Sequence, residues 1–291
     1  MNNANMMSKT AEIAAPLPEK VTLPVLGAAM HAEDLPAHLA WLVDGARDLE
    51  IQDAITPELL DGDWQARARQ INEILQPYPG RVGIHGPFLS LTLMAQDPQI
   101  RAVVQARLLR ALDFAEAIGA THMVTHSPFD FFGHPMVVHA PAHGLAEQID
   151  LVAATLEPVL PKLEQIDCTL VIETIRDRHS RPLLTLLDTI DAPCVRMSID
   201  VGHVYIGHLL GGPTPDQWVY EAGPRLAHVH LQDTDGDLDR HWPPGMGEIN
   251  WEAFFGALNT LPVRPRLIIE LVDVAQLPRA AEWLTARGLA R

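Results

Sequence analysis

The sequence predicts a single-domain (β/α)8 TIM barrel, an α/β fold in which eight parallel strands alternate with helices. Eight short runs of β-forming residues recur along the chain, and their starts lie about 30 to 45 residues apart. Most of the intervals carry apolar residues at three- and four-residue spacing, as amphipathic helices do. This alternation is typical of a parallel sheet. Eight strands fit a closed barrel better than a doubly wound open sheet, which is the main alternative.

The expected strands are short and rich in aliphatic residues. They cover Val21–Leu26, Leu49–Ile55, Arg81–Ile84, His122–Thr125, Thr169–Ile172, Val195–Ile199, Leu226–Val229 and Arg266–Ile269. Helical spacing predicts Leu35–Gly45, Pro57–Leu75, Pro98–Ile118, Leu145–Leu163, Pro182–Ile190, Trp251–Leu261 and Gln276–Ala286. The segment Tyr205–Val219 is the least regular, because Gly211-Gly212-Pro213 interrupts it.

Length, charge and hydropathy limit the organisation and the partners of the chain. The 291 residues suffice for one barrel over residues 21–291, preceded by a disordered or loosely packed tail over residues 1–20. A formal net charge of −16, without a basic run, disfavours nucleic acid as a partner. Neither a signal peptide nor an apolar stretch of bilayer length is evident, so we expect a cytoplasmic protein without a membrane partner. Formation of a homo-oligomer stays open.

Six successive expected strands end in a residue that can bind a metal ion. Barrel enzymes place their reactive groups at the carboxyl ends of their strands. Those of the third to eighth strands carry, in order, His85, His126, Glu173, Asp200 with His203, His230 and Glu270. His numbers 14 and Asp plus Glu 37 of the 291 residues, so about one residue in six is such a group. Six coincidences in a row therefore favour a common site.

Strand alternation aims these side chains at the barrel axis. Residues two apart on a strand share a face, so Gly83 with His85 and Ser198 with Asp200 are expected to face inward. His228, two residues before His230, should lie deeper, as a core or supporting residue. Mixed imidazole and carboxylate ligands without cysteine suit Zn, Mn, Fe, Co or Mg.

The loop after the seventh strand adds two candidate ligands. Asp239 and His241 are two residues apart, so an extended segment would point both side chains the same way. An exposed polar loop is the alternative. Other residues near the expected barrel mouth are candidates for binding substrate, through an apolar wall, an aromatic surface or a cationic group: Phe88, Arg176, Arg240 and Trp242.

The order of these motifs resembles a known superfamily. The series H-G-P-F, T-H-S-P, I-E-T, I-D-V-G-H, H-x-x-D, D-R-H, G-x-G-E-I-x-W and I-E-L is similar to that of the xylose isomerase-like barrels. These include sugar isomerases and epimerases and the endonuclease IV group, AP endonuclease family 2. The likeness extends from Val21 to the C-terminus.

The resemblance implies two alternative metal arrangements. A sugar epimerase-like site would hold one metal ion on Glu173, Asp200, His230 and Glu270, with the two glutamates as the catalytic proton-transfer groups. An endonuclease IV-like site would hold three zinc ions on nine residues: His85, His126, Glu173, Asp200, His203, His230, Asp239, His241 and Glu270. All nine are present, which implies more than one divalent ion per chain.

We therefore expect a metal-dependent enzyme acting on a small sugar-like or phosphorylated molecule. The preferred expectation is isomerisation or epimerisation of a sugar or sugar phosphate by proton transfer through an enediolate. The alternatives are a multinuclear phosphoesterase and a metal-dependent lyase or dehydratase. The endonuclease group resembled here carries an arginine after the second strand, whereas this chain has Asp53-Ala54-Ile55-Thr56-Pro57. That difference and the acidic charge count against cleavage of DNA.

Overall fold

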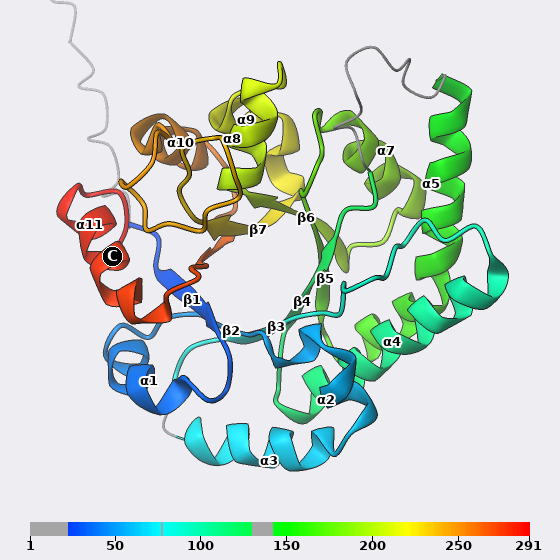
Figure 1. The fold of residues 1–291 in the computed structure, drawn as a ribbon, viewed down its shortest axis with the longest axis horizontal. Helices are drawn as coiled ribbons and strands as arrows, with labels where there is room; N and C mark the ends of the chain where they lie inside the picture. The colour runs from blue at the N-terminus through cyan, green and yellow to red at the C-terminus, as the bar shows by residue number, and fades with distance from the viewer. Residues whose placement is uncertain (1–22, 77, 130–141) are drawn as a thin grey trace, which may run out of the picture.

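A closed eight-stranded parallel barrel forms the centre of the molecule. The computed structural model describes residues 23–76, 78–129 and 142–291, and within them each strand pairs with its neighbours in sequence order while β8 pairs with β1 (Figure 1). The predicted TIM barrel is therefore confirmed. Its strands are β1 (Leu26–Met30), β2 (Leu49–Ile51), β3 (Val82–His85), β4 (His122–His126), β5 (Thr169–Glu173), β6 (Val195–Asp200), β7 (Leu226–Leu231) and β8 (Arg266–Ile269).

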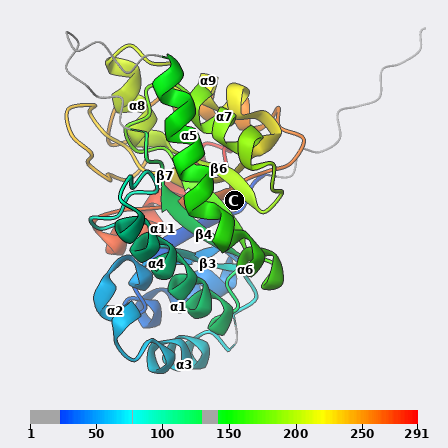
Figure 2. The ribbon, with the colours of Figure 1, turned by 90° about the vertical axis from the view of Figure 1, so that its right-hand side faces the viewer.

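Helices form a ring outside the strands, as α4 and α5 show beside the barrel in Figure 2. Several begin at a proline, whose missing N–H group costs nothing in the first turn. They are α1 (Leu35–Asp44), α2 (Pro57–Asp61), α3 (Trp64–Ile74), α4 (Pro98–Ala117), α5 (Ala142–Leu156), α6 (Leu160–Gln165), α7 (Arg181–Ile190), α8 (Val201–Leu209), α9 (Pro215–Ala222), α10 (Trp251–Leu258) and α11 (Leu277–Ala286).

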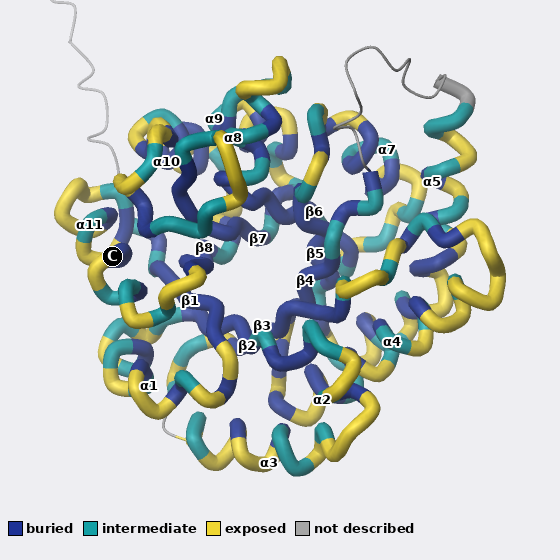
Figure 3. The backbone as a smooth tube through the Cα atoms, in the orientation of Figure 1, coloured by how far each residue is buried: buried dark blue, intermediate teal, exposed yellow. Residues whose placement is uncertain are grey.

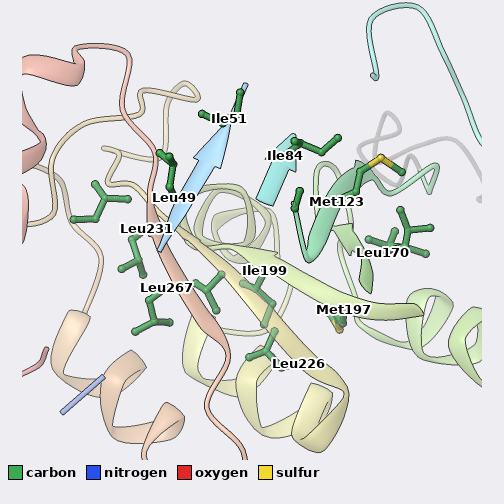
Figure 4. Packing of buried hydrophobic residues seen from close by; sticks show 14 of the residues in the cluster. Leu49, Ile51, Ile84, Met123, Leu170, Met197, Ile199, Leu226, Leu231 and Leu267 are labelled. Atoms are coloured by element: carbon green, nitrogen blue, oxygen red, sulfur yellow. The ribbon is translucent and has the colours of Figure 1, made fainter. Parts of the chain in front are cut away.

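The two faces of each strand serve different purposes. Outward residues such as Leu49, Ile51 and Ile84 are fully buried and join the hydrophobic core between the barrel wall and the helices (Figure 4). Most strand residues are buried, whereas the helices expose their outer faces to solvent (Figure 3). The inward residues line the barrel axis, and many of them are polar. The core thus supports a polar interior that continues to the mouth of the barrel.

The first strand lies later in the chain than predicted. β1 covers Leu26–Met30 rather than Val21–Leu26. Pro24 and Leu26 instead pair with the C-terminus, because Arg291 N–H donates to the Pro24 carbonyl at 2.9 Å and Leu26 N–H donates to the Arg291 carbonyl at 3.1 Å. The strand itself has small residues, and a Cβ on Gly27 would lie 2.5 Å from the Asp48 carbonyl. Close backbone approach therefore required a sequence of low β-propensity.

Other boundaries differ where a turn continues an apolar run or a proline breaks a helix. β2 ends at Ile51, and Asp53–Ile55 forms a 3-10 turn. The helix expected over Leu145–Leu163 is divided by a second 3-10 turn at Glu157–Val159, which contains Pro158. The one expected over Pro57–Leu75 is divided into α2 and α3 after Gly62, where Asp63 caps α3.

The expected tail, residues 1–20, lies outside the described residues. Among those described, no helix has the length and apolar character needed to cross a membrane.

Candidate metal centre

Four strand ends bring their side chains to one buried point. Glu173 of β5, Asp200 of β6, His230 of β7 and Glu270, directly after β8, each offer a ligand atom, and these atoms all lie within 4.8 Å of one another. His230 Nδ1 lies 2.9 Å from Glu173 Oε1 and 3.3 Å from Glu270 Oε2. The convergence follows from strand alternation in a closed barrel.

Two further groups of potential ligands adjoin the first. Ligand atoms of His85, His126 and Glu173 form one group, so Glu173 belongs to two. The third group joins His203 with the loop residues Asp239 and His241. Asp239 Oδ2 lies 3.0 Å from His203 Nε2, and its Oδ1 lies 3.2 Å from His241 Nε2. The Asp239 side chain is about half exposed, but the pair faces the mouth rather than forming a detached surface loop. All nine predicted ligands are thus brought together.

The donor set fits divalent cations. Glu173 Oε2 and Asp200 Oδ2 are buried and have no hydrogen-bond partner among the described residues. A buried carboxylate oxygen without a donor costs free energy unless a cation or a proton neutralises it. Imidazole nitrogens and carboxylate oxygens are ligands for zinc and manganese. The residues present therefore fit the metal ions that the resemblance implies.

Burial and charge shift the acidities of these groups in opposite directions. Burial raises the pKa of Asp200 to about 6 and lowers that of His126 to about 3. Burial would also raise the pKa of Glu173, but His230 and His85 hold it well below its usual value. Burial would lower the pKa of His241, but its hydrogen bond to the Asp239 carboxylate and the charge of Glu270 outweigh burial and raise the pKa to about 9. The site is therefore a set of strongly interacting charges, as metal and catalytic sites commonly are.

A cavity of about 370 Å³ opens above these groups. Its wall combines the candidate ligands His85, His126, Glu173, His203, Asp239, His241 and Glu270 with Gln52, Ile55, Phe88, Ile175, Leu271 and Val272. The Phe88 ring stacks on His126 with a centroid separation of 3.8 Å, so this substrate-binding candidate lies at the site. Asp200 and His230 lie beneath the cavity, completely buried.

The other three substrate-binding candidates lie farther out. Arg176 lines a neighbouring cavity of about 210 Å³ that shares His126 and Ile175 with the first. Arg240 pairs with Asp235 at 2.9 Å and lies over the Trp242 ring. Arg240 and Trp242 line neither of these two cavities.

Two glutamines that the sequence analysis did not single out support the ligands. Gln52 Nε2 donates to Glu270 Oε1 at 2.7 Å. Gln232 Nε2 lies 3.0 Å from both Asp200 Oδ1 and Asp239 Oδ1, which links two of the ligand groups. A shorter second strand would have revealed Gln52 as the residue directly after its end. Gln232 follows His230 by two residues and therefore shares its inward face.

A second buried polar cluster lies on the inward faces of the strands and was also missed in part. We call Glu50, His122, His228, Ser198 and Arg266 the interior cluster. Glu50 Oε2 lies 3.1 Å from His122 Nε2 and 3.0 Å from His228 Nε2, the latter without hydrogen-bond alignment. His228 is fully buried, as expected. Glu50 stands between the apolar residues of β2, so its inward position was the available signal.

The interior cluster holds a buried carboxylate in its charged form. Burial would raise the pKa of Glu50, but His230, His122 and His228 hold it well below its usual value. Burial lowers the pKa of His122 to about 3. A neutral imidazole and a carboxylate therefore face each other here.

The fold and the site together define an α/β barrel with a candidate metal centre at the carboxyl ends of its strands. A family model described as xylose isomerase-like TIM barrel matches residues 45–287. The chain belongs to this family.

Solved structures share the barrel at low sequence identity. The TTHB071 protein from Thermus thermophilus, in a crystal soaked with ZnCl2, has a TM-score of 0.67 and 24% identity, covering 92% of this chain and 99% of that one. A D-tagatose 3-epimerase-like protein has a TM-score of 0.73 and 18% identity, covering 90% and 96%. The 3-keto-D-glucoside 4-epimerase YcjR from E. coli has a TM-score of 0.69 and 16% identity, covering 90% and 99%. At these identities the likeness shows the fold alone.

Proposed function

We propose that this protein is a metal-dependent isomerase or epimerase of a sugar or sugar phosphate. The observation that carries the proposal is the convergence of Glu173 and Glu270 on one cavity, with Asp200 and His230 beneath them. Two carboxylates beside a carbonyl substrate can remove and return a carbon-bound proton. The sugar epimerases among the structures that share the fold support the same chemistry.

Each residue of the site has a distinct task in this reaction. Glu173, Asp200, His230 and Glu270 would hold a divalent ion, which supplies Lewis-acid polarisation of the substrate oxygens. One glutamate takes the proton from the carbon next to the carbonyl, which gives an enediolate. The other glutamate returns a proton to complete the isomerisation or epimerisation. Gln52 orients Glu270 through its hydrogen bond, and Phe88 excludes water on one side.

The dimensions and polarity of the mouth favour a small polar substrate. A cavity of about 370 Å³ lies within the range of small-molecule sites. Arg176 lines the neighbouring cavity, which supports the proposal that a phosphate or carboxylate group of an extended substrate binds there. Ions held by His85, His126, His203, Asp239 and His241 would add positive charge at this otherwise acidic mouth.

Exchange of the carbon-bound proton tests the proposal. We expect manganese- or zinc-loaded protein in deuterated water to introduce deuterium next to the carbonyl of a ketose or ketose phosphate. Glu173→Gln and Glu270→Gln should lower the exchange rate by about 100- to 10,000-fold, because an amide cannot accept the proton. Glu248→Gln is the matched control, since Glu248 is exposed and lies outside the cavity wall. Absence of exchange across a panel of ketoses and their phosphates would contradict the proposal.

Hydrolysis of a phosphoester is the second candidate. It is favoured by the three adjoining ligand groups, which offer more ligands than one metal ion needs. Adjacent metal ions can stabilise the attacking and leaving oxygens of a phosphoryl transfer. Metal-dependent cleavage of abasic DNA or a simple phosphodiester, without any deuterium exchange, would establish this function in place of the first.

A further inference from the structure

A chain of polar side chains crosses the barrel interior and ends at a candidate metal ligand. Arg266 Nη1 lies 2.6 Å from His122 Nδ1, and His122 Nε2 lies 3.1 Å from Glu50 Oε2. The other Glu50 oxygen, Oε1, lies 2.9 Å from His230 Nε2. The chain therefore joins the lower interior to the residue that faces Glu173 and Glu270.

The donor and acceptor roles along this chain follow from its first member. A guanidinium group can only donate hydrogen bonds, so His122 Nδ1 must accept from Arg266. A neutral His122 then carries its proton on Nε2 and donates to Glu50. Glu50 accepts this bond through Oε2, and its other oxygen, Oε1, lies beside His230 Nε2 at 2.9 Å. A carboxylate oxygen in this place accepts from the His230 Nε2–H group.

This direction determines which His230 nitrogen is available to a metal ion. Nδ1 faces the other central ligands, at 2.9 Å from Glu173 Oε1 and 3.3 Å from Glu270 Oε2, whereas Nε2 faces Glu50. A metal ion on the central group would therefore bind Nδ1 in place of a proton, and the proton on Nε2 would stay. A metal-binding imidazole commonly donates its other N–H group to a carboxylate, which fixes the ring and its tautomer.

The side chains of this polar series are closely packed. A Cβ added at Gly83 would lie 1.8 Å from His122 Cε1, so the imidazole occupies the place that any larger residue of β3 would fill. Glu50, His122 and His230 are all at most 1% exposed. Water therefore cannot replace a missing partner without rearrangement of the barrel interior.

We infer that Glu50, oriented by the Arg266–His122 pair, is a positioning residue that presents His230 Nδ1 to the central metal ion. The inference rests on the proposed metal site. It assigns Glu50, His122 and Arg266 a role in metal affinity, without contact between Glu50 and the substrate.

Zinc binding and histidine NMR test the inference. In the zinc-loaded wild type, long-range ¹H–¹⁵N spectra, with the His230 ring assigned by comparison with His230→Asn, should show zinc on Nδ1 and a proton on Nε2. Glu50→Gln should lower the affinity of the central site for Zn²⁺ by about 10- to 100-fold, because one amide cannot accept from both imidazoles. Ser198→Ala is the matched control: Ser198 lies in the same interior cluster, and its hydroxyl is within 2.8 Å of His228 Nδ1. Its Zn²⁺ affinity should remain within about threefold of the wild type, the scatter normal for changes outside the site.

The outcomes separate this inference from the proposed function. A zinc-loaded wild type with its proton on His230 Nδ1 would overturn the inference without any variant. Equal Zn²⁺ affinity of Glu50→Gln and wild type would also overturn it, as would an additional zinc ion bound by Glu50 itself. If wild-type protein binds no Zn²⁺ or Mn²⁺, the metal-dependent function fails as well. Gly83→Ala gives an independent check, because it should displace His122 and lower zinc affinity while leaving Glu50 in place.

Discussion

The mouth and the interior of the barrel contain the same types of residue in opposite states. At the mouth, Glu173 Oε2 and Asp200 Oδ2 are buried beside an open cavity, without hydrogen-bond partners in the part of the chain that the structure describes. In the interior, both Glu50 oxygens lie against imidazole nitrogens at 2.9 to 3.1 Å, and no cavity opens onto them among those described. A cluster of His and Glu therefore does not identify a metal site by composition alone. Unused lone pairs and access from solvent distinguish the two.

This difference also indicates how the energy is distributed. The metal-free mouth carries unfavourable buried charge, which metal binding would relieve. In the interior cluster, by contrast, neighbouring imidazoles stabilise the charge of the Glu50 carboxylate. We therefore expect variants of the mouth to act mainly on metal binding and turnover, and variants of the interior to act on folding and on ligand orientation.

The largest effect is expected at the ligand that two groups share. Glu173→Ala removes a ligand from both the His85 group and the Asp200 group. Metal analysis after dialysis should show the loss of both ions, and turnover should fall by about 100- to 10,000-fold. His241→Ala affects one group and should release one ion only. Full metal retention in Glu173→Ala would break the distinction between mouth and interior.

We expect a variant of the interior cluster to lower the free energy of unfolding. Glu50→Ala removes the carboxylate that faces three buried imidazoles. Only His230 is a charged partner, because the surrounding carboxylates outweigh burial and raise its pKa well above the usual value. Removal of one partner of such a buried charged pair costs about 3–5 kcal/mol. Urea unfolding of metal-free protein should show this decrease in the free energy of unfolding. An unchanged free energy of unfolding would mean that the imidazoles do not stabilise the Glu50 carboxylate as the distances indicate.

The pH dependence of metal-free protein should distinguish the mouth. Burial raises the pKa of Asp200 from 3.8 to about 6, so its proton binds more tightly in the folded state. The folded protein therefore loses stability as pH rises through this range, by up to about 3 kcal/mol above pH 6. Asp200→Asn, which keeps an oxygen to cap α8, should lack this decrease in chelator-treated samples. An equal pH dependence in wild type and variant would contradict the assignment.

The smallest effect is stabilisation by metal. Zinc at 100 times its dissociation constant should raise the free energy of unfolding by about 2.7 kcal/mol. The wild type and Ser198→Ala should both show the increase in thermal unfolding. Asp200→Ala should not, because it lacks a ligand of the central group.

The alternation of strands and helices was enough to predict the barrel, but not where its first strand begins. Period-2 and helical patterns depend on side-chain burial, and these are strong in β5 to β8. β1 instead depends on close backbone approach at Gly27, which a residue-by-residue pattern does not reveal. The pairing of Pro24 with the C-terminus is likewise a long-range contact.

The residues of the candidate site were likewise predictable only in part. Seven of its nine candidate ligands were predictable because they lie at or just after strand ends, which meet at one edge of a barrel. Asp239 and His241 lie in the loop after β7 and were predicted from their two-residue spacing. Glu50 was missed because its one sequence signal, an inward position between the apolar residues of a three-residue strand, does not reveal its partners. Gln52 was missed because the apolar residues of the 3-10 turn extended the expected strand to Ile55. Glu50 differs from Glu173 in how many of its oxygens accept hydrogen bonds. These contacts form only in the folded interior, so the sequence does not show the difference.

Anomalous diffraction from zinc-soaked crystals would test most directly whether the mouth binds metal and the interior cluster does not. We predict zinc peaks at the mouth, including one bound by Glu173, Asp200, His230 and Glu270, and no peak between Glu50, His122 and His228. A peak in the interior cluster, or an empty central group at the mouth with zinc bound elsewhere, would contradict the account.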